Sequence, residues 1–199
     1  MNNANPKNQL SFKGIITAII IAVLAVASMS CFYTIDTGER GVVLRFGKLI
    51  NVSGEGLNFK VPAMDDVKIM SVRDQNLTIK TEVSSSDIQT IAVEVSLVYS
   101  LNPNEVGKVF QTYGMNIENT LIRPTLSEKI NAVIADYPIE TFVEKRAEIS
   151  SRINTAFAEQ VAGNGIIVKS LLITNHDFSD DFNKAIEDKK IAEQGALTA

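Results

Sequence analysis

The residues that could perform acid–base or nucleophilic chemistry are few and lie far apart in this sequence. His176 is the only histidine and Cys31 the only cysteine, so the chain lacks the clusters that hold zinc and cannot form an internal disulfide. A general base needs a group that positions it, and His176 has only Asp177 beside it. A histidine where a strand gives way to a helix is more often structural. We therefore predict no catalytic residue, no metal site and no cofactor.

The remaining reactive groups have simpler structural explanations. The run Ser84, Ser85 and Ser86 has the composition of a hairpin turn. The acidic pairs at positions 65–66 and 180–181 consist of adjacent residues, whose side chains point in different directions on a strand or turn. Neither pair makes a catalytic dyad. The sequence therefore predicts a protein that is not an enzyme.

Length and charge exclude further classes. The chain has 199 residues, enough for one ordinary domain with a hydrophobic core and a short appendage. Its formal net charge is −4, and acidic and basic residues are spread along the sequence. Nucleic-acid binding needs a basic face. We expect neither nucleic acid nor a small-molecule substrate as a partner.

The longest apolar run lies near the N-terminus. No charged residue occurs between Lys13 and Asp36. A helix over this stretch is about long enough to cross a hydrocarbon core ~30 Å thick. We predict an N-terminal tail at 1–13 and a transmembrane anchor at 14–33, with these membrane-anchoring residues: Ile15, Ile16, Ile19, Ile20, Val23, Leu24 and Phe32.

Two alternatives to a permanent anchor remain for this segment, a cleaved signal peptide and a lipoprotein signal that ends at Cys31. The apolar run is longer than that of most signal peptides, and Ser28 stands where a lipoprotein signal has an aliphatic residue. These features favour the anchor. Its orientation is not decided by charge, because lysines precede the run and Arg40 and Arg45 follow it.

The chain from Tyr33 to Leu101 has the pattern of a sheet with one buried face. Short β-branched and apolar runs are separated by glycine and proline, and the last run alternates apolar with polar residues. The predicted strands are 41–46, 57–61, 67–72, 77–83 and 88–101.

Helical spacing replaces this alternation between residues 102 and 164. We predict helices at 103–113, 116–136 and 138–161, followed by a strand at 166–174. Pro124 either kinks the second helix or starts a new one. The order indicates an α+β domain with a mostly antiparallel sheet and packed helices. The second helix is expected to bury Ile117, Leu121, Ile130, Val133 and Ile134. The solvated face of the third, or a face toward another subunit, would carry Glu140, Glu144, Lys145, Arg146, Glu148 and Arg152.

The last segment, residues 179–199, is predicted to open a coiled coil. Ser179 is a good N-cap, and the residues after it are mostly Ala, Glu, Asp and Lys. The apolar stripe is thin, so such a helix needs a neighbour to be stable. The residues expected to contribute to oligomerisation are Phe182, Ile186, Lys189 and Ala192.

Two blocks in this order carry a family resemblance. The first comprises residues 36–48 (DTGERGVVLRFGK) and 54–62 (GEGLNFKVP), and the second comprises 175–178 (NHDF) and 185–194 (AIEDKKIAEQ). Together they strongly resemble the prohibitin/stomatin (SPFH, band 7, PHB domain) family, above all the prohibitins and the HflK/HflC-like proteins. The resemblance implies an SPFH domain at 34–178 between the anchor and the coiled-coil segment.

The resemblance also implies a function. Members of that family form rings on membranes, and the prohibitin and HflK/HflC types associate with FtsH-type membrane AAA proteases. This chain would then be a membrane-anchored oligomeric scaffold that modulates such a protease or membrane-protein quality control. Its partners would be copies of itself or a paralogous subunit, membrane lipid and the protease. The expected location is a bacterial or mitochondrial inner membrane, with the domain on the non-cytoplasmic side. The alternative is a stomatin-like organiser of membrane microdomains without a protease partner.

Overall fold

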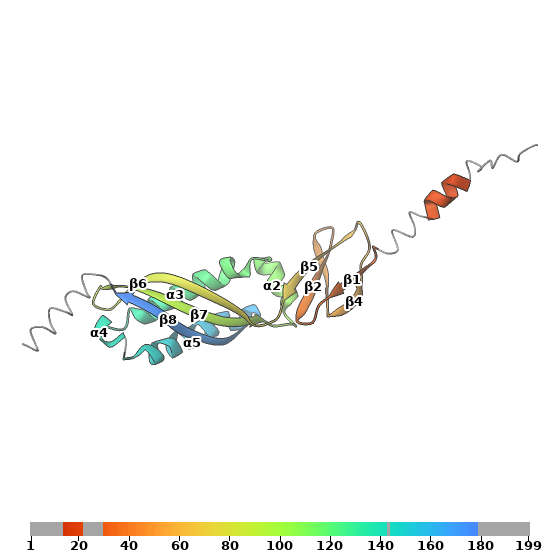
Figure 1. The fold of residues 1–199 in the computed structure, drawn as a ribbon. Coiled ribbons are helices and arrows are strands. Elements are labelled where there is room, and N and C mark those ends of the chain that lie inside the picture. The colour runs from red at the N-terminus through yellow and green to blue at the C-terminus, as the bar shows by residue number, and fades with distance from the viewer. Residues whose placement is uncertain (1–13, 22–29, 143, 179–199) are drawn as a thin grey trace, which may run out of the picture. The chain divides into compact units, whose positions relative to one another are not determined.

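The computed structural model describes residues 14–21, 30–142 and 144–178 (Figure 1). The chain forms two compact units, Met1–Ile69 and Met70–Ala199, and each is described by itself. Val23 and Leu24 of the predicted anchor lie outside the described residues, as does the predicted coiled-coil segment at 179–199.

The first described element is a helix at residues 14–21. Its isoleucine side chains are all exposed: Ile15, Ile16, Ile19, Ile20 and Ile21. Among the described residues, no helix is both long and apolar enough to cross a membrane.

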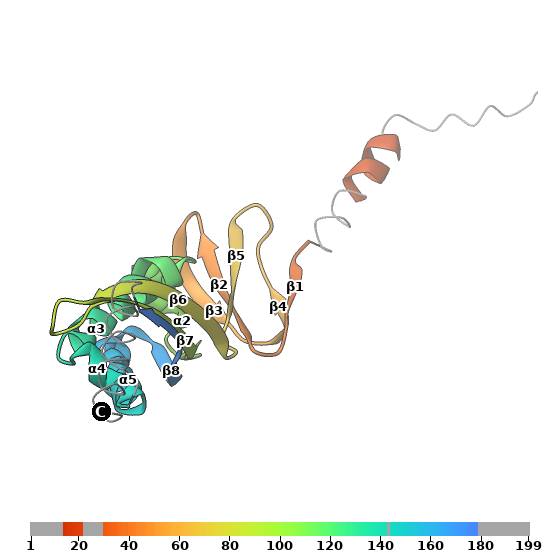
Figure 2. The same cartoon turned by 60° about the vertical axis from the view of Figure 1, so that its left-hand side comes forward.

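The strands of the first unit form two small sheets. Strand β1 (Phe32–Ile35) pairs antiparallel with β4 (Gly56–Phe59), and the two lie side by side in Figure 2. The second sheet has the strand order β3-β2-β5, built from β2 (Glu39–Arg45), β3 (Lys48–Ser53) and β5 (Asp65–Ser71). The predicted strands at 41–46, 57–61 and 67–72 are therefore present with shifted ends, whereas β1 and β3 were not predicted.

Strand β1 requires a correction to the predicted anchor, which ran to residue 33. Phe32 and Tyr33 are not helical but pair with Phe59 and Asn58 of β4. The physical reason is that backbone pairing with β4 satisfies their N–H and C=O groups, which an apolar sequence alone does not reveal.

The second unit contains a three-stranded antiparallel sheet in the order β6-β7-β8. Its strands are β6 (Gln75–Ser84), β7 (Thr90–Leu101) and β8 (Ile166–Phe178). Side chains on one face of β7 are fully buried at Ile91 and Val95, and the same alternation continues along the strand. The predicted one-sided sheet is confirmed for this unit.

Helices cover the buried face of this sheet. They are α2 (Val106–Tyr113), α3 (Arg123–Ile134), α4 (Ile139–Phe142) and α5 (Arg146–Val161), and α3 contacts β6 while α5 contacts β8. The predicted stripe of the third helix is buried at Ile139, Phe142, Ile149, Ile153, Phe157 and Val161.

The predicted helix at 116–136 begins instead with a π-helical turn, Glu118–Ile122. Pro124 lies in the first turn of α3. Proline lacks an N–H and clashes with the preceding turn, so the series of α-helical hydrogen bonds is interrupted at Pro124. The π-helical turn before it accommodates one extra residue. That residue rotates the helix face, so Ile122 is fully buried where Leu121 was predicted to be. The π-helical turn also supplies Glu118, which accepts a hydrogen bond from the Tyr99 hydroxyl at 2.8 Å.

The charged residues predicted as a solvated face of the third helix are only partly so. The Arg146 guanidinium donates to the carbonyl oxygen of Ile173, with Nε at 3.0 Å. Lys145 and Arg152 lie over the Tyr137 ring, 5.7 and 5.3 Å from its centroid, and the Tyr137 hydroxyl donates to Glu148 at 2.8 Å. Lys145, Glu148 and Arg152 are nevertheless exposed, which confirms the predicted solvated face for them, whereas Arg146 is half-buried.

Candidate functional site

The β1–β4 ribbon carries an exposed apolar face. Phe32 pairs with Phe59 and Thr34 with Leu57, so these side chains share one face of the ribbon. Phe32, Leu57 and Phe59 are 56%, 72% and 63% exposed. The two phenylalanine rings pack edge to face, with centroids 5.9 Å apart. We call Phe32, Leu57 and Phe59 the apolar ribbon face.

The opposite face of the ribbon is fixed to the rest of the first unit. Ile35 is buried, and it packs so closely on Gly41 that a Cβ atom at Gly41 would lie 2.5 Å from Ile35 Cδ1. The Tyr33 hydroxyl donates to the Ser53 hydroxyl at 2.8 Å. Because the inner face is held in this way, the ribbon cannot turn its apolar ribbon face inward without breaking these contacts.

A charged clamp holds the chain that follows β4. Arg45 donates to both carboxylate oxygens of Asp65, at 2.7 and 3.0 Å, and the Val61 N–H donates to the same carboxylate at 2.8 Å. The Arg45 hydrogen bond, and then the Val61 N–H, lower the pKa of Asp65 below its usual range. The Asp65 side chain is almost fully buried. The clamp thus joins β2 to β5 and fixes the turn that leads away from the apolar ribbon face.

A further apolar side chain of the first unit points into solvent at the β2–β3 turn. Phe46 is 78% exposed and has φ +49, and its N–H donates to the Met64 carbonyl at 3.2 Å. A single exposed apolar residue is ordinary, so the apolar ribbon face, which groups three such side chains, is the stronger indication of contact with lipid or with another protein.

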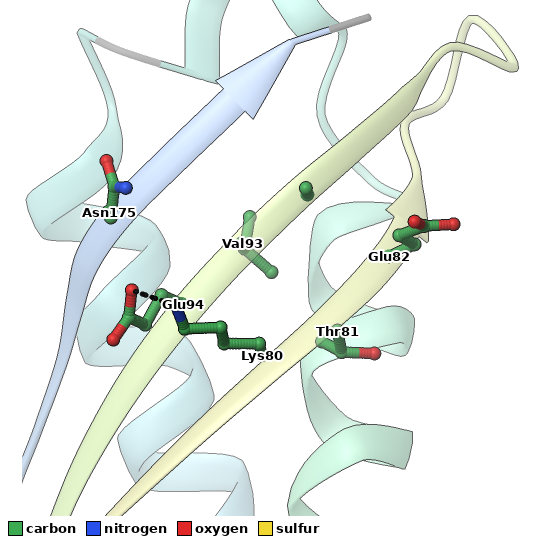
Figure 3. A pocket seen from close by; sticks show the side chains of 7 residues that line it. Lys80, Thr81, Glu82, Val93, Glu94 and Asn175 are labelled. Carbon is green, nitrogen blue, oxygen red and sulfur yellow. Dashed lines mark ion pairs between the residues drawn. The ribbon is translucent and has the colours of Figure 1, made fainter.

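The outer face of the β6–β7–β8 sheet has different chemistry. Figure 3 shows Lys80 and Glu94 side by side on neighbouring strands, with an ion pair of 3.5 Å across a shallow hollow of about 240 Å³. Asn175 of β8 and Glu82 complete a polar rim. An exposed pair of this kind contributes about 0–1 kcal/mol, and the hollow offers no buried nucleophile or base. The surface around this hollow is polar, although Leu172 of β8 is 60% exposed elsewhere on the sheet.

The residues considered for chemistry have structural partners. The Ser85 hydroxyl donates to Asp87 at 2.5 Å inside the β6–β7 turn, which confirms the predicted hairpin. His176 belongs to β8, where it pairs with Val93, and so lies within the strand. Within the described ranges, no three His, Cys, Asp or Glu side chains are grouped so as to hold a metal ion.

The predicted site residues have different outcomes. Four of the anchoring isoleucines lie on the exposed helix 14–21, and Phe32 lies on the apolar ribbon face. The predicted oligomerisation residues Phe182, Ile186, Lys189 and Ala192 lie outside the described residues. Leu57 and Phe59 were missed because the predicted strand 57–61 did not show which of its faces is buried. The available signal was their alternation with polar Asn58 in a strand beside an apolar N-terminal segment.

Comparison with known proteins agrees with this architecture. The model of the SPFH domain / Band 7 family matches residues 33–199. Mitochondrial prohibitin complex protein 1 of Caenorhabditis elegans is 25% identical over 174 residues, covering 86% of this chain and 63% of the relative. Prohibitin-7, mitochondrial, of Arabidopsis thaliana is 28% identical, covering 85% of this chain and 62% of the relative.

Prohibitin-1 of Saccharomyces cerevisiae is 25% identical over 184 residues, covering 92% of this chain and 64% of the relative. The chain thus spans a little less than two thirds of the length of these curated relatives. Since the family model matches most of the sequence, the chain belongs to the SPFH domain / Band 7 family.

Proposed function

We propose that this protein is a subunit of a membrane-associated scaffold that assembles with copies of itself or with a paralogous subunit. The observation that carries the proposal is the apolar ribbon face, which lies directly after an N-terminal segment rich in exposed isoleucines. Fully burying a side chain such as Leu or Phe is worth about 1.5–3 kcal/mol, so three of them favour an apolar environment strongly. We assign lipid as that environment.

Residues 14–33 were expected to anchor the protein, and the proposal keeps the part before β1 in that role. The anchor would place the first unit at the surface of a bacterial or mitochondrial inner membrane, on the non-cytoplasmic side. Four relatives carry "mitochondrial" in their names, which supports the second location. The name of the C. elegans relative refers to a complex, which supports assembly. Phe182, Ile186, Lys189 and Ala192 would contribute to the contact between subunits.

The proposed role of the assembly is to modulate an FtsH-type membrane AAA protease or membrane-protein quality control. This step rests on the family alone, and the alternative is a stomatin-like organiser of membrane microdomains with no protease partner. In either case the scaffold itself needs no active site, and any peptide-bond cleavage belongs to another protein.

The test has two stages. Full-length protein should remain in the membrane pellet after washing with alkaline carbonate, because burial of apolar surface is not disrupted by charge. Crosslinking in those membranes should capture copies of the chain together with a AAA protease, and removal of the chain should change the half-lives of membrane-embedded substrates. Release by carbonate would contradict the membrane role. Unchanged half-lives with no protease in the crosslinked material would favour the microdomain organiser.

A further inference from the structure

The tip of the β6–β7 hairpin carries an apolar side chain in a strained backbone conformation. Ile88 is 87% exposed and has φ +62. β-branched residues are genuine outliers in this region, where glycine or asparagine is usual. An exposed apolar side chain and a strained backbone each cost free energy. A turn whose only role is folding would therefore be expected to have a different residue at this position. Strained positions that persist are candidates for function.

The surrounding hydrogen bonds prevent the tip from relaxing. The Ser85 hydroxyl donates to Asp87 at 2.5 Å and accepts from the Gln89 N–H at 3.1 Å. Asp87 also accepts from the Ile139 N–H at 3.2 Å, and the Ser86 N–H donates to the Tyr137 carbonyl at 3.0 Å. The tip is therefore bonded both to its own strands and to the chain before α4. It presents Ile88 in one fixed position.

The chain leaves the described structure beside this tip. Strand β8 runs antiparallel to β7, toward the hairpin, and its last residue, Phe178, pairs with Ile91. Ile88 is three residues before Ile91, at most about 10 Å along the chain. Phe182 is four residues after Phe178, a rise of about 6 Å if the segment is helical as its composition predicts. The first apolar residue of the segment 179–199 is thus within reach of Ile88.

We propose that Ile88 is the docking point for the first turns of the segment 179–199 of the same chain, with Phe182 packed on Ile88. The segment has a thin apolar stripe that needs a neighbour, and Ile88 is a rigid apolar neighbour at its point of exit. The contact would fix the direction in which the segment leaves the domain. This proposal deepens the proposed function. It rests on that function in so far as segment 179–199 is the segment assigned there to contact between subunits.

A disulfide crosslink tests the contact in the full chain. Cys31 is the only cysteine, so Cys31→Ser gives a background free of thiols. In that background, Ile88→Cys with Phe182→Cys should oxidise to a disulfide within one chain, seen as faster migration without reductant. Ile167→Cys with Phe182→Cys is the matched control, because Ile167 is exposed and pairs with Ser100 at the end of β7 away from the hairpin, and it should not form an intrachain bond. Crosslinks only between chains would assign Ile88 to a neighbour's segment and overturn the proposal, as would no crosslink at all.

Relief of the strain provides a second, independent measurement. Ile88→Gly suits the positive φ and should leave the domain at least as stable, while trypsin should cleave at Lys184, Lys189 and Lys190 about tenfold faster. Ala63→Gly relieves the same kind of strain at another exposed turn and should leave cleavage unchanged. Cleavage of Ile88→Gly at the wild-type rate would overturn the proposal. Particle size of the same samples reports on assembly separately, so the two proposals can fail independently.

Discussion

Two β-structures in this protein alternate in the same way and yet present opposite outer faces. In the β1–β4 ribbon the inner face is fixed by Ile35, and the outer face carries phenylalanine and leucine. In the β6–β7–β8 sheet the inner face is equally buried, but the outer face carries the Lys80–Glu94 pair. Strand alternation decides only that the two faces differ. The outer face of the ribbon is apolar at Phe32, Leu57 and Phe59, whereas that of the sheet mixes an ion pair and polar residues with exposed Leu172.

The largest effect, on binding to lipid vesicles, is expected from placing charged side chains on the apolar ribbon face. A fragment of residues 30–199 keeps β1 intact and should float with phosphatidylcholine–phosphatidylglycerol vesicles through the apolar ribbon face. Leu57→Asp with Phe59→Asp should reduce partitioning about 100-fold or more, since each side chain loses a favourable transfer. Thr78→Asp on the polar sheet should change nothing. If the fragment does not bind vesicles and instead dimerises through Leu57 and Phe59, the apolar ribbon face contacts a protein rather than lipid.

A smaller effect should follow from loosening the ribbon's inner face. Gly41→Val places side-chain atoms where Ile35 and Val67 already pack, and we expect a loss of about 1–3 kcal/mol in the free energy of unfolding. Thermal denaturation of the 30–199 fragment measures it. Gly54→Ala, at a position with open space, is the control and should stay within about 0.5 kcal/mol. Equal stabilities for the two variants would show that the ribbon is not held by this contact.

The Asp65 clamp gives the first unit a distinct response to acid. The folded pKa of Asp65 is lowered, so its contribution is complete above the unfolded value of about 3.9 and is lost as pH falls through the folded value. The protection factors of amides in β2 and β5, which are corrected for the intrinsic pH dependence of exchange, should therefore fall in acid by more than global unfolding explains. Asp65→Asn should remove most of that difference. An unaltered pH profile in this variant would assign the response to another carboxylate.

The smallest effect belongs to the sheet's polar face. Lys80→Met breaks the ion pair with Glu94, but Lys80 is well exposed, so the loss should be about 0.5 kcal/mol or less and should vanish in high salt. Urea denaturation at low and high ionic strength measures it. A loss as large as that of Gly41→Val would mean that this face is covered in the assembled protein and that the contrast with the ribbon is less sharp.

Sequence reasoning succeeded where a periodic pattern was long and failed where the pattern depended on a distant partner. The alternation in β7 and the stripe of α5 were predicted because each repeats over several turns or residues. The first half of strand β1 was assigned to the anchor because Phe32 and Tyr33 suit the end of an apolar helix as well as a strand, and only the pairing with β4 distinguishes the two. The π-helical turn was missed for a related reason. Pro124 indicated an interruption, but not the extra residue that buries Ile122 in place of Leu121.

The candidate site was predicted less completely than the fold. The anchoring isoleucines follow from composition, but Leu57 and Phe59 look like core residues until the strand's inner face is known. Likewise, Arg146 and Arg152 have the spacing of solvated charges, and their partners Ile173 and Tyr137 lie in other elements. A single sequence does not show which residues of other elements lie close to these two arginines.

The hydrogen bond between Arg146 and Ile173 affects how the edge of β8 can interact with strands of other molecules. In the described part of the chain β8 pairs only with β7, so its other side is an edge that could recruit a foreign strand. At Ile173 that edge is occupied, because the carbonyl accepts from Arg146 and the N–H donates to the Ser150 hydroxyl at 3.3 Å. In the proposed membrane scaffold, where subunits would be concentrated, open edges of this kind would favour pairing of strands between subunits. Because the backbone of Ile173 is already engaged by α5, this edge is less able to accept a strand from a neighbouring subunit.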